Sequence, residues 1–157
     1  MGSKRVGLAR TQALIQNLKR ELQLNQSTLK GGLKQVISLT GSGATRTLTS
    51  DDSGAIVNMG GSDASTVTLP TPAAGISFRF VATTAVAHVI NGGSSKLQGG
   101  YHHNTNGATV ARVGISDKSA LTLHNSNAAL GDTLEFWSDG TNWYVSGIVN
   151  DIITQTS

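Results

Sequence analysis

The sequence contains no cysteine, so disulfide bonds, zinc–thiolate sites and cysteine nucleophiles are excluded. It also has no apolar run approaching the roughly 20 residues that a membrane-spanning helix needs. The opening stretch, MGSKRVGLARTQALIQNLKREL, reaches a charge before any continuous apolar segment has formed, unlike a signal peptide. We therefore expect a protein made in the cytoplasm, with no membrane among its partners.

Charged residues, prolines and aromatic residues are scarce as well. Charged residues make up 13% of the 157-residue chain, well below the usual quarter, and there are two prolines and seven aromatic residues. Glycine is abundant, with 19 residues, and Ser, Thr and Asn are frequent. This composition is typical of β-structure with many tight turns, and the length fits one domain with an appended arm.

The net charge of +3 is unevenly distributed along the chain. Residues 1–34 carry seven Lys or Arg and one acid, which is a net charge of +6, whereas residues 35–157 carry five bases and eight acids, which is −3. The sequence therefore predicts a basic arm over residues 1–34 and a mildly acidic body over residues 35–157.

An amphipathic helix is predicted over residues 6–25 of the arm. Leu14, Ile15, Leu18 and Leu22 recur at the spacings of one apolar helix face, and strong helix formers lie between them. A heptad spacing connects Leu8, Ile15, Leu22 and Leu29. Only one of the three intermediate seam positions is apolar, so a coiled coil would be short and weak. A single helix that rests on a neighbouring surface is the other interpretation.

The body has the pattern of many short strands separated by turns. Runs rich in Val, Ile, Thr and Phe recur about every ten residues, which is typical of an all-β sandwich or jelly-roll-like barrel. The predicted strands are 36–39, 44–49, 54–59, 65–69, 76–83, 86–91, 108–114, 119–124, 132–138 and 142–149. Both prolines lie in LPTPAAG at 69–75, which we interpret as a break, and residues 91–107 are predicted to form an exposed loop.

Four of the seven aromatic residues lie in GDTLEFWSDGTNWYVSG, residues 131–147. Asp139-Gly140 between two β-rich runs predicts a hairpin with a two-residue turn, so that Ser138 pairs with Thr141. Because side chains alternate along a strand, one face then holds four residues expected in the core: Leu134, Phe136, Trp143 and Val145. The other face holds Glu135, Trp137, Tyr144 and Ser146. Trp137 and Tyr144 are diagonal neighbours in this register.

No constellation of residues predicts an enzyme, a cofactor site or a metal site. The G-x-G of GSGATR at 41–46 has neither a following helix pattern nor a phosphate-binding lysine. Adjacent residues of a strand point to opposite faces, so His102 and His103 are poorly placed to share a metal ion within one chain. Asp51 and Asp52 lie between two predicted strands, where Asp commonly stabilises turns.

The basic arm leaves nucleic acid open as a partner, because Lys and Arg neutralise phosphates. No aromatic residues are interleaved with these bases, and the body is acidic. Both observations argue against nucleic acid and favour an arm that either increases solubility or docks on a partner.

Three stretches resemble small virion structural proteins of tailed bacteriophages, particularly those of cyanobacterial and other aquatic hosts. They are RTLTSDDSGAIVNMGGSDASTVTLPTPAAGISFRFVAT (46–83), the aromatic stretch (131–147) and VGLARTQALIQNLKRELQLNQSTLKG (6–31), together about half of the chain. Such patterns occur in head decoration (cement) proteins and in tail fibre or spike modules. The resemblance implies a non-enzymatic β module that is commonly trimeric.

The compact body with one short arm favours the head. We expect a decoration protein on the outer capsid surface of the virion, which forms a homotrimer and bridges subunits of the major capsid protein. The arm residues expected to contact the lattice or another subunit are Arg10, Leu14, Ile15, Leu18 and Leu22. Trp137 and Tyr144 are candidates for an oligomer or capsid interface, where aromatic residues are enriched. The alternative is a receptor- or carbohydrate-binding module of the tail, in which this pair would stack on sugar rings.

Overall fold

The computed structural model describes residues 7–20, 35–104, 110–123 and 129–157. Two compact units divide the chain, Met1–Lys34 and Gln35–Ser157. In the first unit, residues 7–20 form an α-helix within the predicted range, and the Thr11 hydroxyl donates to the Gly7 carbonyl one turn earlier, at 2.9 Å. The rest of the predicted helix, including Leu22, and also Leu29, lies outside the described residues.

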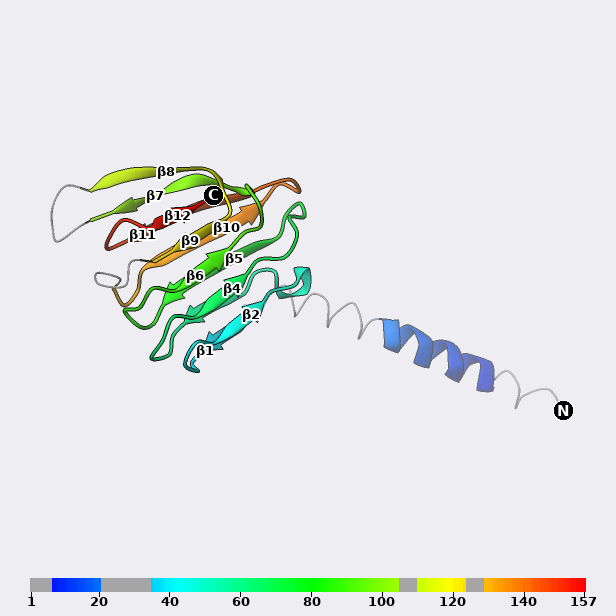
Figure 1. The fold of residues 1–157 in the computed structure, drawn as a ribbon. Helices are drawn as coiled ribbons and strands as arrows, with labels where there is room; N and C mark the ends of the chain where they lie inside the picture. The colour runs from blue at the N-terminus through cyan, green and yellow to red at the C-terminus, as the bar shows by residue number, and fades with distance from the viewer. Residues whose placement is uncertain (1–6, 21–34, 105–109, 124–128) are drawn as a thin grey trace. The chain divides into compact units, whose positions relative to one another are not determined.

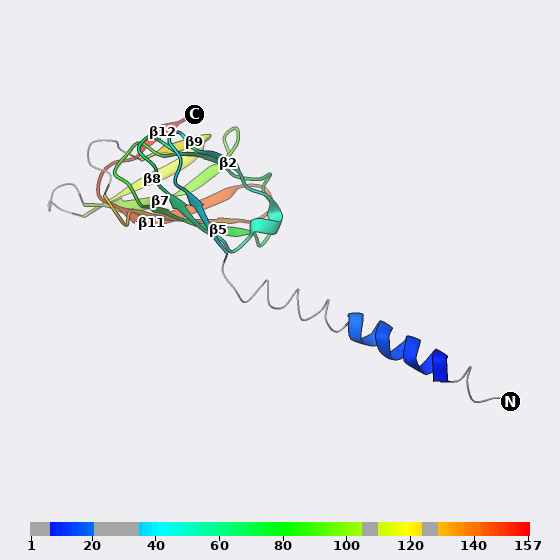
Figure 2. The ribbon, with the colours of Figure 1, turned by 90° about the horizontal axis from the view of Figure 1, so that it is seen from below.

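The second unit is a sandwich of two mixed β-sheets (Figure 1), which confirms the predicted all-β fold class with an N-terminal helix. In spatial order, the seven-stranded sheet contains β1 (Val36–Leu39), β3 (Ile56–Met59), β5 (Ser77–Ala82), β10 (Thr133–Ser138), β11 (Trp143–Val149), β7 (Leu97–His103) and β8 (Ala111–Lys118). The five-stranded sheet contains β12 (Thr154–Thr156), β9 (Ala120–Thr122), β6 (Val89–Asn91), β4 (Thr66–Thr68) and β2 (Thr45–Thr47). Figure 2 shows the two layers, with β2, β9 and β12 in one and β5 and β11 in the other.

From β1 to β6 the chain alternates between the two sheets, and successive strands of each sheet pair in parallel. This path makes three turns of a flattened solenoid, in which each turn stacks on the one before it. Ile37, Val57 and Phe80 occupy matched positions of three neighbouring strands, and all three are buried between the sheets. The core is thus built as ladders of apolar side chains that run across the strands.

The C-terminal hairpin, β10–β11, lies in the middle of the larger sheet. β10 pairs with β5 in antiparallel orientation, and β11 pairs with β7 in parallel orientation. The hairpin therefore joins two parts of the sheet, the solenoid strands β1, β3 and β5 on one side and β7 and β8 on the other. Without the hairpin, β5 and β7 would each lack a pairing partner on one side. The sequence predicted the strands of this hairpin but not their central position or the parallel pairing.

Two strands were not predicted. β7 falls within residues 91–107, so the prediction of a loop there is wrong for Leu97–His103, and β12 lies beyond the last predicted strand. β8 also begins and ends later than the predicted strand 108–114. Gly99 and Gly100 obscure the strand pattern of β7, but Gly99 has a positive φ of 114°, and a Cβ there would collide with the Val145 backbone of β11. Glycine at this position permits the close approach of the two strands.

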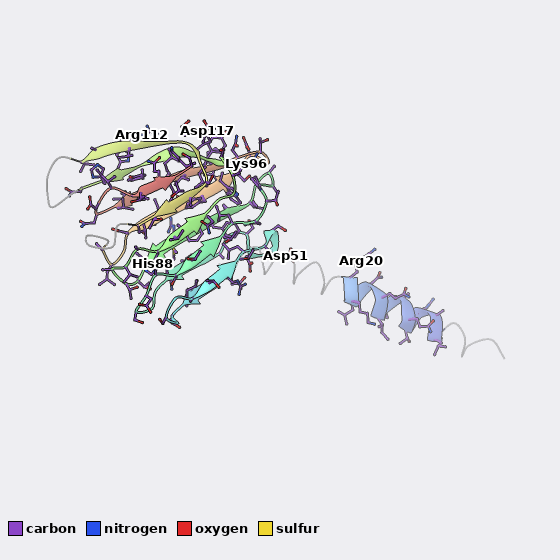
Figure 3. All side chains as sticks on the ribbon, viewed as in Figure 1. Arg20, Asp51, His88, Lys96, Arg112 and Asp117 are labelled. Atoms are coloured by element: carbon purple, nitrogen blue, oxygen red, sulfur yellow. The ribbon has the colours of Figure 1, made fainter. Side chains whose placement is uncertain are left out.

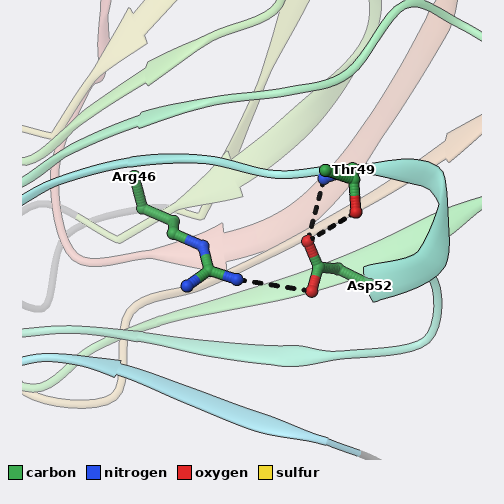
Figure 4. A network of polar contacts seen from close by, with 3 residues as sticks. All are labelled: Arg46, Thr49 and Asp52. Atoms are coloured by element: carbon green, nitrogen blue, oxygen red, sulfur yellow. Dashed lines mark hydrogen bonds and ion pairs between the residues drawn. The ribbon is translucent and has the colours of Figure 1, made fainter.

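The corner between β2 and β3 explains the paired carboxylates at 51–52. A single turn of 3-10 helix, Ser50–Asp52, occupies this corner. The Thr49 amide and hydroxyl donate to Asp52 Oδ2 at 2.9 and 3.0 Å, and Arg46 lies 3.5 Å from Asp52 Oδ1 (Figure 4). Asp52 is therefore a turn-stabilising residue, as predicted, and its oxygens are occupied by this network.

Candidate functional site

The register of the C-terminal hairpin differs from the prediction by two residues. Ser138 pairs with Trp143, and Asp139–Asn142 form a four-residue connection in place of the predicted two-residue turn. Asp139 Oδ1 accepts hydrogen bonds from the Thr141 and Asn142 amides, at 2.7 and 2.9 Å, which stabilises this longer turn. A shift of two residues keeps every side chain on its predicted face, whereas a shift of one would have exchanged the faces.

Phe136 and Trp143 lie in the core, as predicted. Trp143 has no exposed surface, and its ring contacts Phe78 at a centroid distance of 5.7 Å. Phe136 packs edge-to-face on Phe80 at 5.1 Å. The indole Nε1 of Trp143 donates to the Pro70 carbonyl at 3.2 Å, so the LPTPAAG segment closes over this end of the core.

Trp137 and Tyr144 form a stacked pair on the outer face of the sheet. They are directly opposite in the register, and not diagonal as predicted, with ring centroids 4.4 Å apart and ring planes 16° from parallel. Trp137 is 50% exposed although it lies on a central strand. The Tyr144 hydroxyl donates to Asp139 Oδ2 at 3.0 Å. The turn that connects the strands thus also fixes the orientation of the tyrosine.

The electrostatics of this pair follow from the same turn. The Asn142 and Thr141 amides donate to the Asp139 carboxylate and lower its pKa. The hydrogen bond from the Tyr144 hydroxyl to the Asp139 carboxylate is the larger cause of a raised pKa of Tyr144, and the negative charge of Asp139 is the next. Tyr144 therefore keeps its proton and remains the donor in this contact at neutral pH.

Polar side chains surround the aromatic pair. Ser77 of β5 is the register partner of Trp137, and Gln98 of β7 is the register partner of Tyr144. The next pair along the same face, Arg79 and Glu135, forms an ion pair in which both side chains are about half exposed. The sequence placed Trp137 and Tyr144 on one face but could not identify Ser77, Arg79 or Gln98, because strand order decides which residues adjoin the hairpin.

A shallow hollow of about 650 Å³ lies at the opposite end of the hairpin from its turn. Leu130 and Ile148 contribute its most exposed apolar side chains, at 75% and 71% exposure, and Asp132 lies at its edge. Asp132 accepts hydrogen bonds from the Ala129 and Asn150 amides at 3.0 and 2.9 Å, so its carboxylate holds the ends of β10 and β11 together. Sequence reasoning did not single out this hollow, because its walls come from separate segments.

The N-terminal helix presents its apolar stripe to solvent. Leu14 is 69% exposed and Leu18 is 57% exposed, and Ile15 and Arg10 are exposed as well. Leu22, the fifth predicted contact residue of the arm, lies outside the described residues. By helical periodicity, Arg10 and Lys19 flank the apolar stripe on its two sides. Among the described helices, none is both long enough and apolar enough to span a membrane.

Within the part of the chain that the structure describes, no group of three or more His, Cys, Asp or Glu residues could hold a metal ion. His102 is exposed and His103 is buried, on opposite faces of β7. His88, labelled in Figure 3, is fully buried, and its Nδ1 accepts a hydrogen bond from the Ser65 amide at 3.1 Å. Its ring thus connects two segments of the core.

Comparisons of the chain with models of protein families, with curated proteins and with solved structures find no match.

Proposed function

We propose that the protein is a phage capsid decoration protein that attaches to the head through its N-terminal helix and displays its β-sandwich on the outer surface. The observation that carries this proposal is the exposed apolar stripe of the helix, formed by Leu14, Ile15 and Leu18 and flanked by bases. An amphipathic helix with its apolar side in water gains free energy when that side is buried against a partner. The resemblance of the sequence to virion structural proteins supports the head lattice as that partner.

Charge supports a lattice surface that is acidic as well as apolar. The arm carries +6 and the body −3, so an acidic capsid exterior attracts the arm and repels the body. Attachment through the arm would then orient the sandwich away from the shell.

A decoration protein of this kind acts mechanically. Contacts that bridge neighbouring capsid protein subunits exist only in the closed lattice, so binding stabilises the assembled shell over its dissociated parts. A trimer would place three arms on the lattice at once, and each additional arm would raise the effective affinity of the complex.

The experiment compares the full-length protein with the double variant Leu14→Gln/Leu18→Gln in binding to heads of the encoding virus that have been freed of decoration protein. Glutamine has about the same helix propensity as leucine, so the helix is retained while its apolar surface is lost. Two leucines that are buried on binding contribute about 3 kcal/mol, and their loss should weaken binding about a hundredfold.

The matched control is Ala9→Gln/Ala13→Gln, which introduces the same residues at the same spacing on the opposite side of the helix. We expect its affinity for the heads to equal that of the unaltered protein. Equal binding by all three proteins would refute the role of the arm.

A further inference from the structure

A ledge on the outer face of the larger sheet combines an exposed indole with planar polar side chains. It consists of Trp137, Tyr144, Ser77, Arg79 and Glu135, and we call it the indole ledge. Strand register brings these residues together from β5, β10 and β11. All five residues belong to the second unit, and none of them is part of the N-terminal helix.

Tyr144 covers one face of the indole, and the other face, which we call the free face, lies towards the small residue Ser77. Tyr144 stacks on the side towards β11. On the side towards β5 the register partner is Ser77, whose side chain is too small to cover an indole. On the far side of Ser77 the neighbouring residue is Gly54, two residues before Ile56, which is the partner of Arg79 at the start of β3. Gly54 has no side chain, and even a Cβ there would meet nothing within 4 Å. The half-exposed Trp137 can therefore receive a flat apolar surface on this side.

The indole is held in place before any ligand arrives. Asp139 accepts the Tyr144 hydroxyl while its other oxygen accepts two backbone amides of the turn. Tyr144 is thereby fixed, and it supports Trp137 from behind. A rigid binding surface loses little conformational entropy on binding, which favours affinity for small ligands.

Hydrogen-bonding groups lie beside the free face of the indole. The Arg79 guanidinium donates to Glu135 Oε1, and both side chains keep about half of their surface in water. The guanidinium retains free donors, and the carboxylate retains free acceptor positions. The Ser77 hydroxyl adds a group that can both donate and accept.

We propose that the indole ledge binds a neutral saccharide. The C–H face of a pyranose ring would lie against the free face of Trp137, and adjacent hydroxyls at the ring edge would donate to Glu135 and accept from Arg79. Because Arg79 and Glu135 neutralise one another, the ledge has no excess positive charge that would select an acidic sugar. The cores of protein–protein interfaces are depleted of charged residues, whereas this indole is bordered by an ion pair and by Ser77, which favours a sugar over a protein partner.

The test first screens the full-length protein for binding to an array of neutral oligosaccharides. A second screen measures whether the protein is retarded during electrophoresis through gels that contain a soluble glucan, mannan or galactan. The best binder is then titrated by tryptophan fluorescence. Trp143 is fully buried, so a saccharide-dependent change in emission reports Trp137. We expect Trp137→Ala to weaken binding about tenfold or more, and Trp137→Phe, which keeps an aromatic face, to weaken it less.

Ile148→Ala is the matched control. This residue is an exposed apolar side chain on the same face of the same hairpin, in the register pair beyond Glu135 and four residues along β11 from Tyr144. Its truncation removes neither the indole nor a polar group of the ledge, so it should leave saccharide binding unchanged. Retention by none of the arrayed or gel-borne saccharides would overturn the proposal. A second result would also overturn the proposal: no saccharide binding, together with a lower mass in solution for Trp137→Ala than for the unaltered protein, measured by light scattering. Trp137 and Tyr144 would then belong to an interface between protein subunits.

Discussion

At the scale of single residues, His88 shows how a buried polar group is accommodated in this core. Its Nδ1 accepts from the Ser65 amide, so the ring proton lies on Nε2, which is 3.2 Å from the Thr84 carbonyl and donates to it. Both ring nitrogens are thus satisfied in the neutral form. A second proton on Nδ1 would face the Ser65 N–H, which is also a donor.

Burial lowers the pKa of His88 below its ordinary value of 6.5, and this predicts a pH-dependent stability. Below about pH 6.5 the unfolded chain binds a proton at this position that the folded chain does not. The stabilising contribution is therefore complete above pH 6.5 and is lost as the pH falls towards the lowered folded-state value. We expect the free energy of unfolding to fall by up to about 1 kcal/mol from this group between pH 7.5 and 5.5.

The measurement is urea unfolding of the unaltered protein and of His88→Gln at both pH values. The variant should be less stable at pH 7.5, and the difference between the two proteins should narrow at pH 5.5. His102→Asn, at an exposed position of β7, controls for the general effect of pH. A difference that stays constant between the two pH values would contradict this account of His88.

At the scale of the elements, the C-terminal hairpin holds the larger sheet together and also carries the aromatic pair. Its inner face supplies Phe136 and Trp143 to the core, and its outer face supplies Trp137 and Tyr144 to the ledge. On the other side of the hairpin, β11 can pair with β7 because Gly99 lies against the Val145 backbone. The position of the hairpin that carries the ledge therefore depends on the contact of Gly99 with Val145, and Gly99 lies two strands away from Trp137.

Gly99→Ala should destabilise the protein by about 2–4 kcal/mol, because it places a Cβ at a positive φ and against the backbone of β11. Gly114→Ala on the neighbouring strand β8 is the matched control, since a Cβ there would meet nothing within 4 Å. We expect that control to be neutral or slightly stabilising in urea unfolding. Equal stabilities of the two variants would contradict the close approach of β7 and β11.

At the scale of the whole molecule, the sequence predicted two units of opposite charge and a sandwich body, and the structure confirms the fold class. Local patterns sufficed for this, because alternation and turn residues determine which segments are strands. They also placed Phe136 and Trp143 in the core and Trp137 and Tyr144 on the opposite face. Side chains alternate between the faces with a period of two residues, so the predicted faces were correct although the predicted hairpin register was wrong by two residues.

Strand order and parallel pairing were beyond these local patterns. The solenoid path depends on contacts between residues about 20 positions apart, such as Val36 with Ile56, and nothing in either segment alone specifies its neighbour. The same limit applies to the ledge. Ser77 and Arg79 lie far from the hairpin in sequence, and only the pairing of β5 with β10 brings them beside Trp137.

The most direct test of the proposed function is electron cryo-microscopy of the virus particle that contains this protein. We predict density for the sandwich in many copies over the head, with the N-terminal helix against the major capsid protein and its Leu14–Leu18 side buried there. Density for the sandwich only at the tail, in a few copies, would contradict the account, as would a helix that projects from the head without touching the shell.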